Sequence, residues 1–424
     1  MKKTSLLPVI VMILLFGMIS FVTNLASPMG DILKSQFTIP NWQGTLGVFA
    51  NFIAYALMGI PAGNLLQRRG YKTTALIAVS VRILGVGIQL LSGLMGSFGV
   101  YLLGALIAGF SMCLLNTVVN PMLNRLGGGG NRGNQLIQFG GTFNSLCGTA
   151  VIVITGLLIP SIVDARISDT FPLMYTAMAV FALAFLVILL TDIPENSSAN
   201  DSSAEKLPLR GLLAYRHFLL GAIAIFIYVG VEVGTPNILN KWLQNPDLDI
   251  LSDTLNDDDI AASVTGFYWL LMLVGRLIGG VIGAKVSPRR MLAVAASAAV
   301  MLVLLAIFVP ASVSVLFLGF NGAHGFGFNH IPLSAALLVC VGLCTSVMWG
   351  GIFNLAVEGL GRYTERASGL FMALVCGGGI LPLLMNGVVD IFGPAGYMPS
   401  YWIVVAGFAY ILFYALVGSR RRSA

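Results

Sequence analysis

The chain has 424 residues, of which 57% are hydrophobic and only 9% are charged. Soluble globular domains carry about 25% charged residues, so this composition excludes a soluble domain. The net charge of +6 does not indicate nucleic-acid binding, because no basic cluster lies on a polar domain.

Apolar stretches that can each cross a bilayer follow one another along the whole chain. A span needs about 20 mostly apolar residues, and its backbone polar groups must be satisfied within the protein, which favours helices. The sequence therefore predicts an all-α membrane protein with twelve transmembrane helices. Their predicted ranges are 5–26, 44–66, 74–95, 98–122, 138–160, 171–191, 217–240, 260–284, 290–310, 332–357, 367–389 and 399–418. The glycine-rich stretch from Phe317 to Phe328 is interpreted as a loop or a re-entrant segment.

The basic residues fall almost entirely on alternate sides of these spans. With a cytoplasmic N-terminus, 18 of the 23 Lys and Arg residues lie on the cytoplasmic side, as the positive-inside rule requires. We therefore expect both termini to be cytoplasmic and the acidic run from Asp247 to Asp259 to face outward. The five exceptions are Lys34, Arg82, Arg166, Lys241 and Arg276.

The first span begins like a cleavable signal peptide, because Lys2 and Lys3 precede an apolar run. Polar residues at i, i+3, i+4 and i+7 argue against that reading, since they share one helix face. These residues are Ser20, Thr23, Asn24 and Ser27. A stripe of this kind is typical of a helix that lines a polar cavity.

A polar, low-complexity segment divides the twelve spans into six and six. It covers 193–216 and contains the Ser- and Asn-rich stretch Pro194 to Ser203, which is typical of a linker. The predicted organisation is an N-terminal six-helix bundle over 1–192, this cytoplasmic linker, and a C-terminal six-helix bundle over 217–424.

The two halves repeat each other at matching positions. In the loop after the second span and in the loop after the eighth, a Gly lies five and nine residues before basic residues. The residues are Gly63, Arg68 and Lys72 in the first loop and Gly280, Lys285 and Arg289 in the second. Asn120 and Asn354 each precede a Leu-Gly pair at equal spacing in the fourth and tenth spans. The halves are therefore predicted to be pseudo-symmetric.

A parallel repeat of six spans resembles the plan of the major facilitator superfamily, whose substrate site lies between the halves near mid-membrane. The loop over 63–72 reads GNLLQRRGYK and is similar to the superfamily's cytoplasmic signature G-x-x-x-D-R-x-G-R-K. Gln67 stands where that signature has an acid. The resemblance implies the major facilitator fold.

An ordered set of motifs across nearly the whole chain resembles the fucose–proton symporter family, which also contains glucose and galactose permeases. The motifs are Asn24 with Gln36-Phe37-Thr38, Ile60-Pro61-Ala62-Gly63, Asn120-Pro121, Thr142-Phe143-Asn144-Ser145, Tyr228-Val229-Gly230, Gly275-Arg276 and Gly377-Gly378-Gly379-Ile380. The fucose permease has acids where this chain has Ser27 and Asn116. Those acids are tied to proton coupling and sugar binding in that branch, so their replacement leaves the coupling route and fucose itself open.

Glu232 is the acid that lies clearly inside a predicted span, and an intramembrane charge is a functional hypothesis by default. Gly230, Gly234 and Pro236 are expected to loosen this helix and to free carbonyl groups. Glu232 is interpreted as the ion-coupling residue, with Ser27 as a second candidate. The alternative is a structural salt bridge to an arginine.

Amide side chains recur on shared helix faces, and they both donate and accept hydrogen bonds, as sugar hydroxyls do. Trp269 and Trp349 can stack on the apolar face of a sugar ring, and Trp349 occupies the family's aromatic position in the tenth span. The alternative role for the amides is hydrogen bonding between helices. The predicted substrate-binding residues are Asn24, Asn116, Asn120, Gln138, Asn144, Asn237, Trp269, Trp349 and Asn354.

The sequence contains no pattern for catalysis or for cofactor binding. The three histidines and five cysteines have no metal-ligand spacing, and no nucleophile elbow or phosphate-binding loop occurs. We therefore predict neither an enzyme nor a bound metal or cofactor.

These observations predict a secondary transporter of a neutral hexose-type sugar, working by alternating access in a bacterial inner membrane. The expected partners are the sugar, a co-transported cation (sodium, slightly favoured, or proton) and the lipid bilayer, with the chain as a monomer. An efflux transporter of the same fold is the alternative. A membrane sensor is a more distant alternative, because the predicted cytoplasmic segments are short.

Overall fold

The computed structural model describes residues 6–20, 46–158, 167–194, 209–245, 247–248, 250–251, 257–320 and 326–420. These residues form two compact units. The first unit combines Met1–Tyr215 with Val357–Val375, and the second combines Arg216–Ala356 with Cys376–Ala424.

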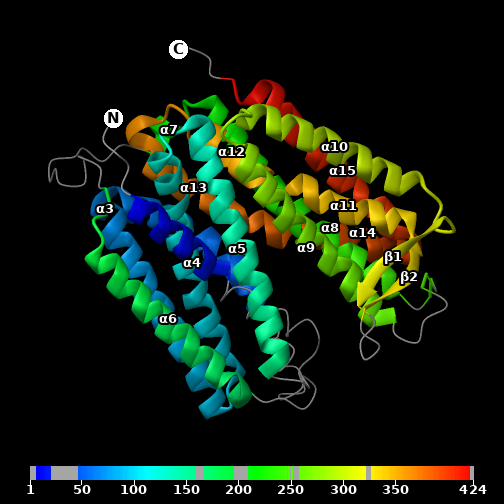
Figure 1. Cartoon of the computed structure of the whole chain (residues 1–424), viewed down its shortest axis with the longest axis horizontal. Helices are drawn as coiled ribbons and strands as arrows, with labels where there is room; N and C mark the ends of the chain where they lie inside the picture. The colour runs from blue at the N-terminus through cyan, green and yellow to red at the C-terminus, as the bar shows by residue number, and fades with distance from the viewer. Residues whose placement is uncertain are drawn as a thin grey trace. The chain divides into compact units, whose positions relative to one another are not determined.

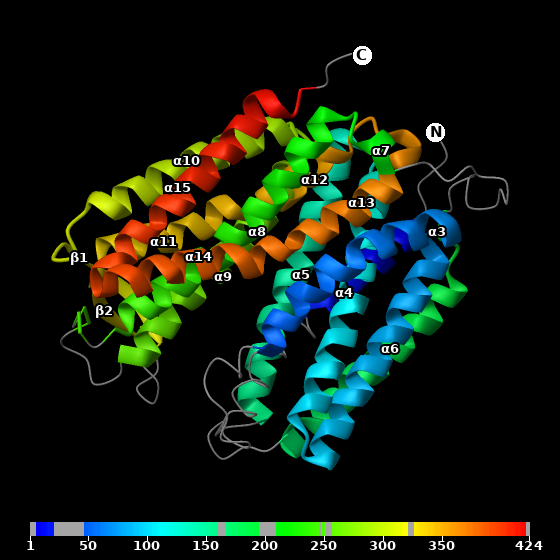
Figure 2. The same cartoon turned by 180° about the vertical axis from the view of Figure 1, so that it is seen from behind.

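The first unit is built from helices and short helical turns (Figure 1). In its described part they are the helix Leu6–Ser20, α3 (Leu46–Met95), α4 (Phe98–Leu126), α5 (Gly130–Leu158), α6 (Phe171–Leu190), the short α7 (Leu209–Leu212) and α13 (Thr364–Ala373), with 3₁₀ turns η1 (Ile167–Thr170) and η3 (Gly361–Tyr363). Although α13 is distant in sequence, it packs on α3 and α4 (Figure 2).

The second unit holds the remaining helices and a hairpin. Its described elements are α8 (Arg216–Leu243), α9 (Asp257–Ile282), α10 (Pro288–Phe308), β1 (Ser314–Phe320), β2 (Phe326–Pro332), α11 (Leu333–Thr345), α12 (Met348–Val357), α14 (Gly377–Phe392), η5 (Gly393–Gly396), α15 (Tyr397–Phe413) and the π-helical turn η6 (Tyr414–Gly418). The 3₁₀ turn η4 (Leu374–Cys376) connects α13 to α14 where the chain passes from one unit to the other.

Helices cover some part of each predicted span. α3 contains both the second and the third spans, and the chain turns between them at Gly70, whose φ of 75° favours glycine. The tenth span is broken between α11 and α12, and the eleventh is broken at η4. By length and composition alone, seven helical segments of the described chain can cross a membrane, and two of these are long enough to hold two spans each.

The helix ends follow local sequence signals. Ser97 caps α4 by accepting a hydrogen bond from the Val100 amide, and Ser287 caps α10 in the same way, directly before Pro288. Serine at the N-cap satisfies an otherwise unpaired amide, and proline at the first helical position loses no helical hydrogen bond.

The stretch that we expected to be a loop or a re-entrant segment is instead an antiparallel hairpin. β1 pairs with β2 in a register that places Ser314 opposite Pro332 and Phe320 opposite Phe326. Alternate residues point to opposite faces of a strand. On one face Phe317 packs edge-on against Phe267 of α9, with ring centroids 5.0 Å apart. The strand pairing and this aromatic contact hold the stretch as two strands, so the expectation of a loop or a re-entrant segment was wrong.

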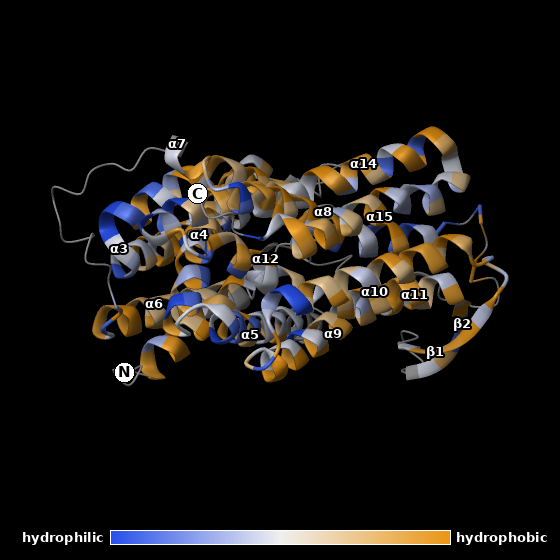
Figure 3. Ribbon diagram, turned by 90° about the horizontal axis from the view of Figure 1, so that it is seen from above, coloured by the Kyte–Doolittle hydropathy of each residue, from blue (hydrophilic) through white to orange (hydrophobic). Residues whose placement is uncertain are grey.

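Hydrophobic residues recur along the helices of both units (Figure 3). Small residues permit the closest helix contacts. On α3, Gly59 and Gly63 lie against Gly369 and Ala373 of α13, where an added β-carbon would meet backbone atoms. This contact attaches α13 to the first unit.

Candidate functional site

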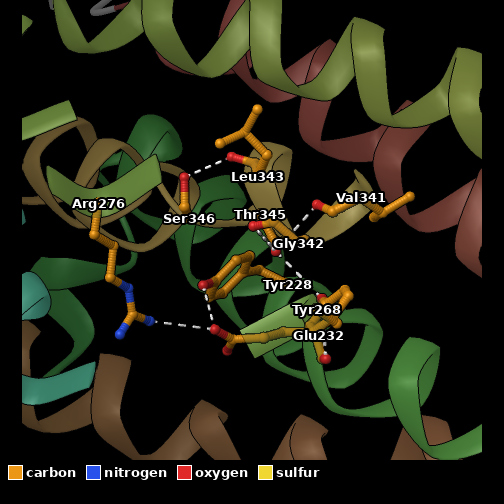
Figure 4. A network of polar contacts seen from close by, with 9 residues as sticks. All are labelled: Tyr228, Glu232, Tyr268, Arg276, Val341, Gly342, Leu343, Thr345 and Ser346. Atoms are coloured by element: carbon orange, nitrogen blue, oxygen red, sulfur yellow. Dashed lines mark hydrogen bonds and ion pairs between the residues drawn. The ribbon is translucent and has the colours of Figure 1, made fainter. Parts of the chain in front are cut away.

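A polar network surrounds Glu232 in the second unit (Figure 4). Glu232 lies on α8, and its Oε1 accepts a hydrogen bond of 2.7 Å from the Tyr228 hydroxyl one turn earlier. The Arg276 guanidinium, from α9, reaches the same oxygen at 3.4 Å. Strong charge-assisted bonds are about 2.7–2.9 Å long, so Arg276 attracts the carboxylate without holding it tightly.

The second carboxylate oxygen of Glu232 is available for a ligand. Within the described residues, both side-chain contacts go to Oε1 and none goes to Oε2. Glu232 and Arg276 expose 12% and 14% of their side-chain surface. A carboxylate oxygen accepts hydrogen bonds from hydroxyl groups and can bind a proton or a metal cation, so Oε2 is the candidate atom of Glu232 for such a ligand.

Pro236 leaves a specific backbone acceptor in α8. Because proline has no amide proton, the carbonyl oxygen four residues earlier, that of Glu232, loses its helical partner. The Tyr268 hydroxyl of α9 donates to this oxygen at 3.2 Å. The helix remains continuous over Arg216–Leu243, so the carbonyl that we expected to be free is occupied by a tyrosine.

The glycines beside Glu232 allow close helix packing. An added β-carbon at Gly230 would meet Leu381 at 2.6 Å, and one at Gly234 would meet Met385 at 2.7 Å, both side chains from α14. These glycines therefore bring α14 against α8, and the helix shows no opening at either position.

A second set of contacts connects Glu232 to the broken tenth span. The Tyr268 hydroxyl lies 3.2 Å from Thr345 Oγ1, at the end of α11. Four residues later, on α12, the Trp349 ring packs on the Tyr228 ring with centroids 6.3 Å apart and planes tilted by 56°. Tyr228 thus contacts both the Glu232 carboxylate and Trp349, and Tyr268 contacts both the Glu232 carbonyl and Thr345.

The other aromatic and amide candidates of this unit lie around the network. Trp269 is 43% exposed, and its ring contacts the Tyr268 ring edge-on at 5.3 Å. Asn237 is exposed and accepts a hydrogen bond of 3.4 Å from Asn386, which itself accepts one of 2.7 Å from Lys241. Asn354, on α12, exposes only 2% of its surface.

In the first unit, the amides of α4 form a buried ladder. Asn120 donates to the backbone and side-chain oxygens of Asn116 at 2.9 and 3.3 Å, and Asn116 donates to the Tyr55 hydroxyl at 2.6 Å. Asn116 exposes 6% of its surface and Asn120 none. Thus Asn116, which replaces an acid of the fucose permease, bonds a neutral tyrosine.

The α5 candidates contact other elements of the first unit separately. Asn144 donates to the Phe16 carbonyl of the first helix at 2.7 Å, and Gln138 is 2% exposed. Asn24 and Ser27 lie outside the described residues. The structure therefore brings Asn116 and Asn120 together, and separately Glu232 and Trp349.

The family profile of the Major Facilitator Superfamily matches residues 9–382 of this chain. The chain belongs to the major facilitator superfamily. It is 29% identical to a glucose/galactose transporter of Brucella abortus over 96% of this chain and 93% of the relative. It is 25% identical to the L-fucose-proton symporter of Escherichia coli, over 93% and 90% of the two chains.

Solved structures show the same fold. A crystal structure of the E. coli fucose:proton symporter aligns with a TM-score of 0.78 at 23% identity, covering 96% of this chain and 98% of the other. The predicted major facilitator fold and the similarity to fucose, glucose and galactose permeases are therefore confirmed. Superfamily membership also supports the prediction of a transporter over that of an enzyme.

Two further charged residues, Glu365 and Arg82, are buried in the first unit. Glu365 lies just before the eleventh predicted span, yet only 5% of it is exposed, and it accepts a hydrogen bond of 3.4 Å from Tyr71. Arg125 acts on it electrostatically. Gln67 lacks the acid of the superfamily signature, and the buried carboxyl group that contacts Tyr71 in the same segment belongs to Glu365 of α13.

The second charged group is Arg82 on α3, which exposes 2% of its surface. It donates to the Ala108 carbonyl at 2.7 Å and lies over the Phe181 ring at 5.8 Å. Among the described residues no carboxylate pairs with it. These contacts agree with a structural role.

The tyrosines that contact Glu232 and Asn116 were not among the site residues predicted from the sequence. Tyr228 precedes Glu232 by four residues, a spacing that could have predicted their contact. Tyr55 and Tyr268 approach from other helices, and no local pattern predicts that. In the described part of the chain, no group of three or more His, Cys, Asp or Glu side chains could hold a metal ion.

Proposed function

We propose that this chain is a secondary transporter that carries a neutral hexose-type sugar across a bacterial inner membrane by alternating access, coupled to a cation. The relatives named for glucose, galactose and fucose support the substrate class. They give no support to the efflux alternative. Both termini are proposed to be cytoplasmic, and the chain is proposed to act as a monomer in the bilayer.

The observation that carries the coupling part is the environment of Glu232. Among the described residues one oxygen of this carboxylate has no partner, the other contacts Tyr228, which packs on Trp349, and Arg276 lies 3.4 Å away. Gain or loss of charge there changes its interactions with all of these groups. We therefore propose Glu232 as the ion-coupling residue and Trp349 as the ring that stacks on the sugar.

The proton is the favoured co-ion. The Arg276 guanidinium opposes the binding of any positive charge to the carboxylate, proton and sodium alike, but a proton needs only one lone pair of one oxygen. Sodium would need several oxygen ligands, and within the described residues no group of three or more His, Cys, Asp or Glu side chains could hold a metal ion. The name of the fucose relative also specifies a proton.

The experiment is uptake of labelled glucose, galactose and fucose into proteoliposomes that contain the purified chain. Separate runs impose an inward proton gradient, an inward sodium gradient, or neither. Accumulation of at least one hexose with the proton gradient alone is expected. Accumulation with sodium alone would correct the co-ion, and the absence of both uptake and exchange for every hexose would overturn the proposed substrate class.

A further inference from the structure

We propose that Tyr228 is a positioning residue that transmits the charge state of Glu232 to the Trp349 ring. This inference rests on the proposed function, because it names the link between the ion site and the sugar site. Tyr228 is the residue whose hydroxyl contacts the carboxylate and whose ring contacts the tryptophan.

Burial makes the tyrosine sensitive to its hydrogen-bond partner. Tyr228 is fully buried, so its hydroxyl cannot turn to water if the carboxylate stops accepting. A hydrogen bond to a charged acceptor is about twice as strong as one to a neutral acceptor. Protonation of Glu232 at Oε2 therefore weakens the 2.7 Å bond and removes the attraction of Arg276.

The backbone carbonyl of Glu232 is held by contacts that do not involve its carboxylate. The Glu232 carbonyl is held by Tyr268, and Tyr268 contacts Thr345 at the α11–α12 break. The backbone of α8 and the end of α11 are thus tied together independently of the carboxylate. The contact that depends on the charge of the Glu232 side chain and also reaches Trp349 is therefore the one made by Tyr228.

The other titratable groups near Glu232 do not provide the connection that Tyr228 makes between the carboxylate and Trp349. Among the described residues, Arg276 and Tyr268 of α9 interact electrostatically with Glu232, whereas Tyr401 of α15 interacts with Tyr268. On α11, Cys344 lies beside Tyr268. The α14 side chains nearest Gly230 and Gly234 are apolar (Leu381, Pro382 and Met385), and the polar Asn386 bonds α8 further along, at Asn237 and Lys241.

The first test needs no sugar. Tryptophan emission of the full chain in detergent is titrated from acid to alkaline pH, and the spectrum of Trp349→Phe is subtracted to isolate Trp349. A single titration step is expected in the unaltered chain and none in Glu232→Gln. In Tyr228→Phe, which keeps the ring, its amplitude should fall about fivefold or more.

Tyr401→Phe is the matched control. Tyr401 is also fully buried and also bonds α8, by donating to the Thr235 carbonyl at 2.9 Å, but the structure shows no contact between it and the Glu232 carboxylate or Trp349. The titration step should persist in this variant. A step in Tyr228→Phe as large as in Tyr401→Phe, a step that survives in Glu232→Gln, or no step in the unaltered chain would each overturn the proposal.

The second test uses transport. The dependence of sugar-exchange affinity on pH, expected to be about tenfold in the unaltered chain, should fall below about twofold in Tyr228→Phe while exchange itself continues. An unchanged pH dependence would overturn the proposal. If no hexose is exchanged even by the unaltered chain, the proposed substrate class fails, whereas the emission titration still decides the role of Tyr228.

Discussion

At the scale of single residues, the side chain and the backbone carbonyl of Glu232 have separate partners. One oxygen takes both side-chain contacts, and the backbone carbonyl of the same residue takes a third from Tyr268. This arrangement separates the groups that hold the helix from the oxygen that is open to a ligand. Two predictions follow from it at this scale.

Glu232→Gln should abolish gradient-driven accumulation of sugar while exchange survives. Glutamine keeps most of the hydrogen-bonding capacity but cannot take up or release the proton. Accumulation and exchange of labelled sugar are measured in the same proteoliposomes. A variant that still concentrates sugar would exclude Glu232 as the coupling residue, and loss of exchange as well would indicate that Glu232 binds the sugar or supports the fold.

Trp349→Ala should weaken sugar binding by about 1–2 kcal/mol, which combines the aromatic contact with the lost apolar area. Trp349 is partly exposed and packs on Tyr228, so part of its ring surface is open to a ligand. Binding is measured by calorimetry on the purified protein, with thermal unfolding as the control for folding. An unchanged affinity in a folded variant would assign Trp349 a structural role.

At the scale of elements, small residues decide which helices come closest. A β-carbon at Gly369 of α13 would lie 2.5 Å from both the Gly59 carbonyl oxygen and the Gly63 α-carbon of α3. Backbone atoms cannot move aside as a flexible side chain can. The attachment of α13 to the first unit therefore depends on the absence of a side chain at this position.

Gly369→Ala should lower the free energy of unfolding by about 1–3 kcal/mol, the usual cost of overpacking. Gly387→Ala is the matched control, because a β-carbon on this α14 glycine meets nothing within 4 Å; there alanine should stabilise the helix by about 0.5–1 kcal/mol. Thermal unfolding of the detergent-solubilised variants measures both. Equal melting temperatures for the two variants would contradict the predicted backbone contact.

At the scale of the whole molecule, the distribution of basic residues predicts the orientation in the membrane. Of the 23 Lys and Arg residues, 18 fall on one predicted side. The five exceptions include Arg82 and Arg276, which the structure shows to be engaged by the protein itself, Arg82 with a carbonyl and a ring and Arg276 with Glu232. Engaged arginines of this kind do not weigh against the orientation.

A cysteine introduced at Ser198, in the predicted linker, should be labelled only from the cytoplasmic side, and one at Asp253 only from outside. Both positions lie outside the described residues, so the prediction depends on the sequence alone. Impermeant thiol reagents applied to intact cells and to inverted vesicles make the measurement, with the native five cysteines replaced. Labelling at Ser198 in intact cells would reverse the orientation.

The sequence alone predicted the helical spans, because crossing a bilayer requires apolar runs of a defined length and leaves a pattern that can be read locally. It also indicated the superfamily and identified Glu232 as the intramembrane acid. It did not predict the hairpin at Ser314–Pro332, since a glycine-rich apolar stretch is compatible with several structures.

Only the tertiary structure decided what each polar group contacts. Pro236 leaves the Glu232 carbonyl without its helical partner, and the Tyr268 hydroxyl, 36 residues further along the chain, bonds it instead. Likewise Tyr71 bonds Glu365, which lies 294 residues away in sequence. A local pattern fixes which face of a helix a residue occupies, but the partner on that face depends on how helices pack. For this reason the sequence located the acid, whereas packing determined that Tyr228 connects it to Trp349.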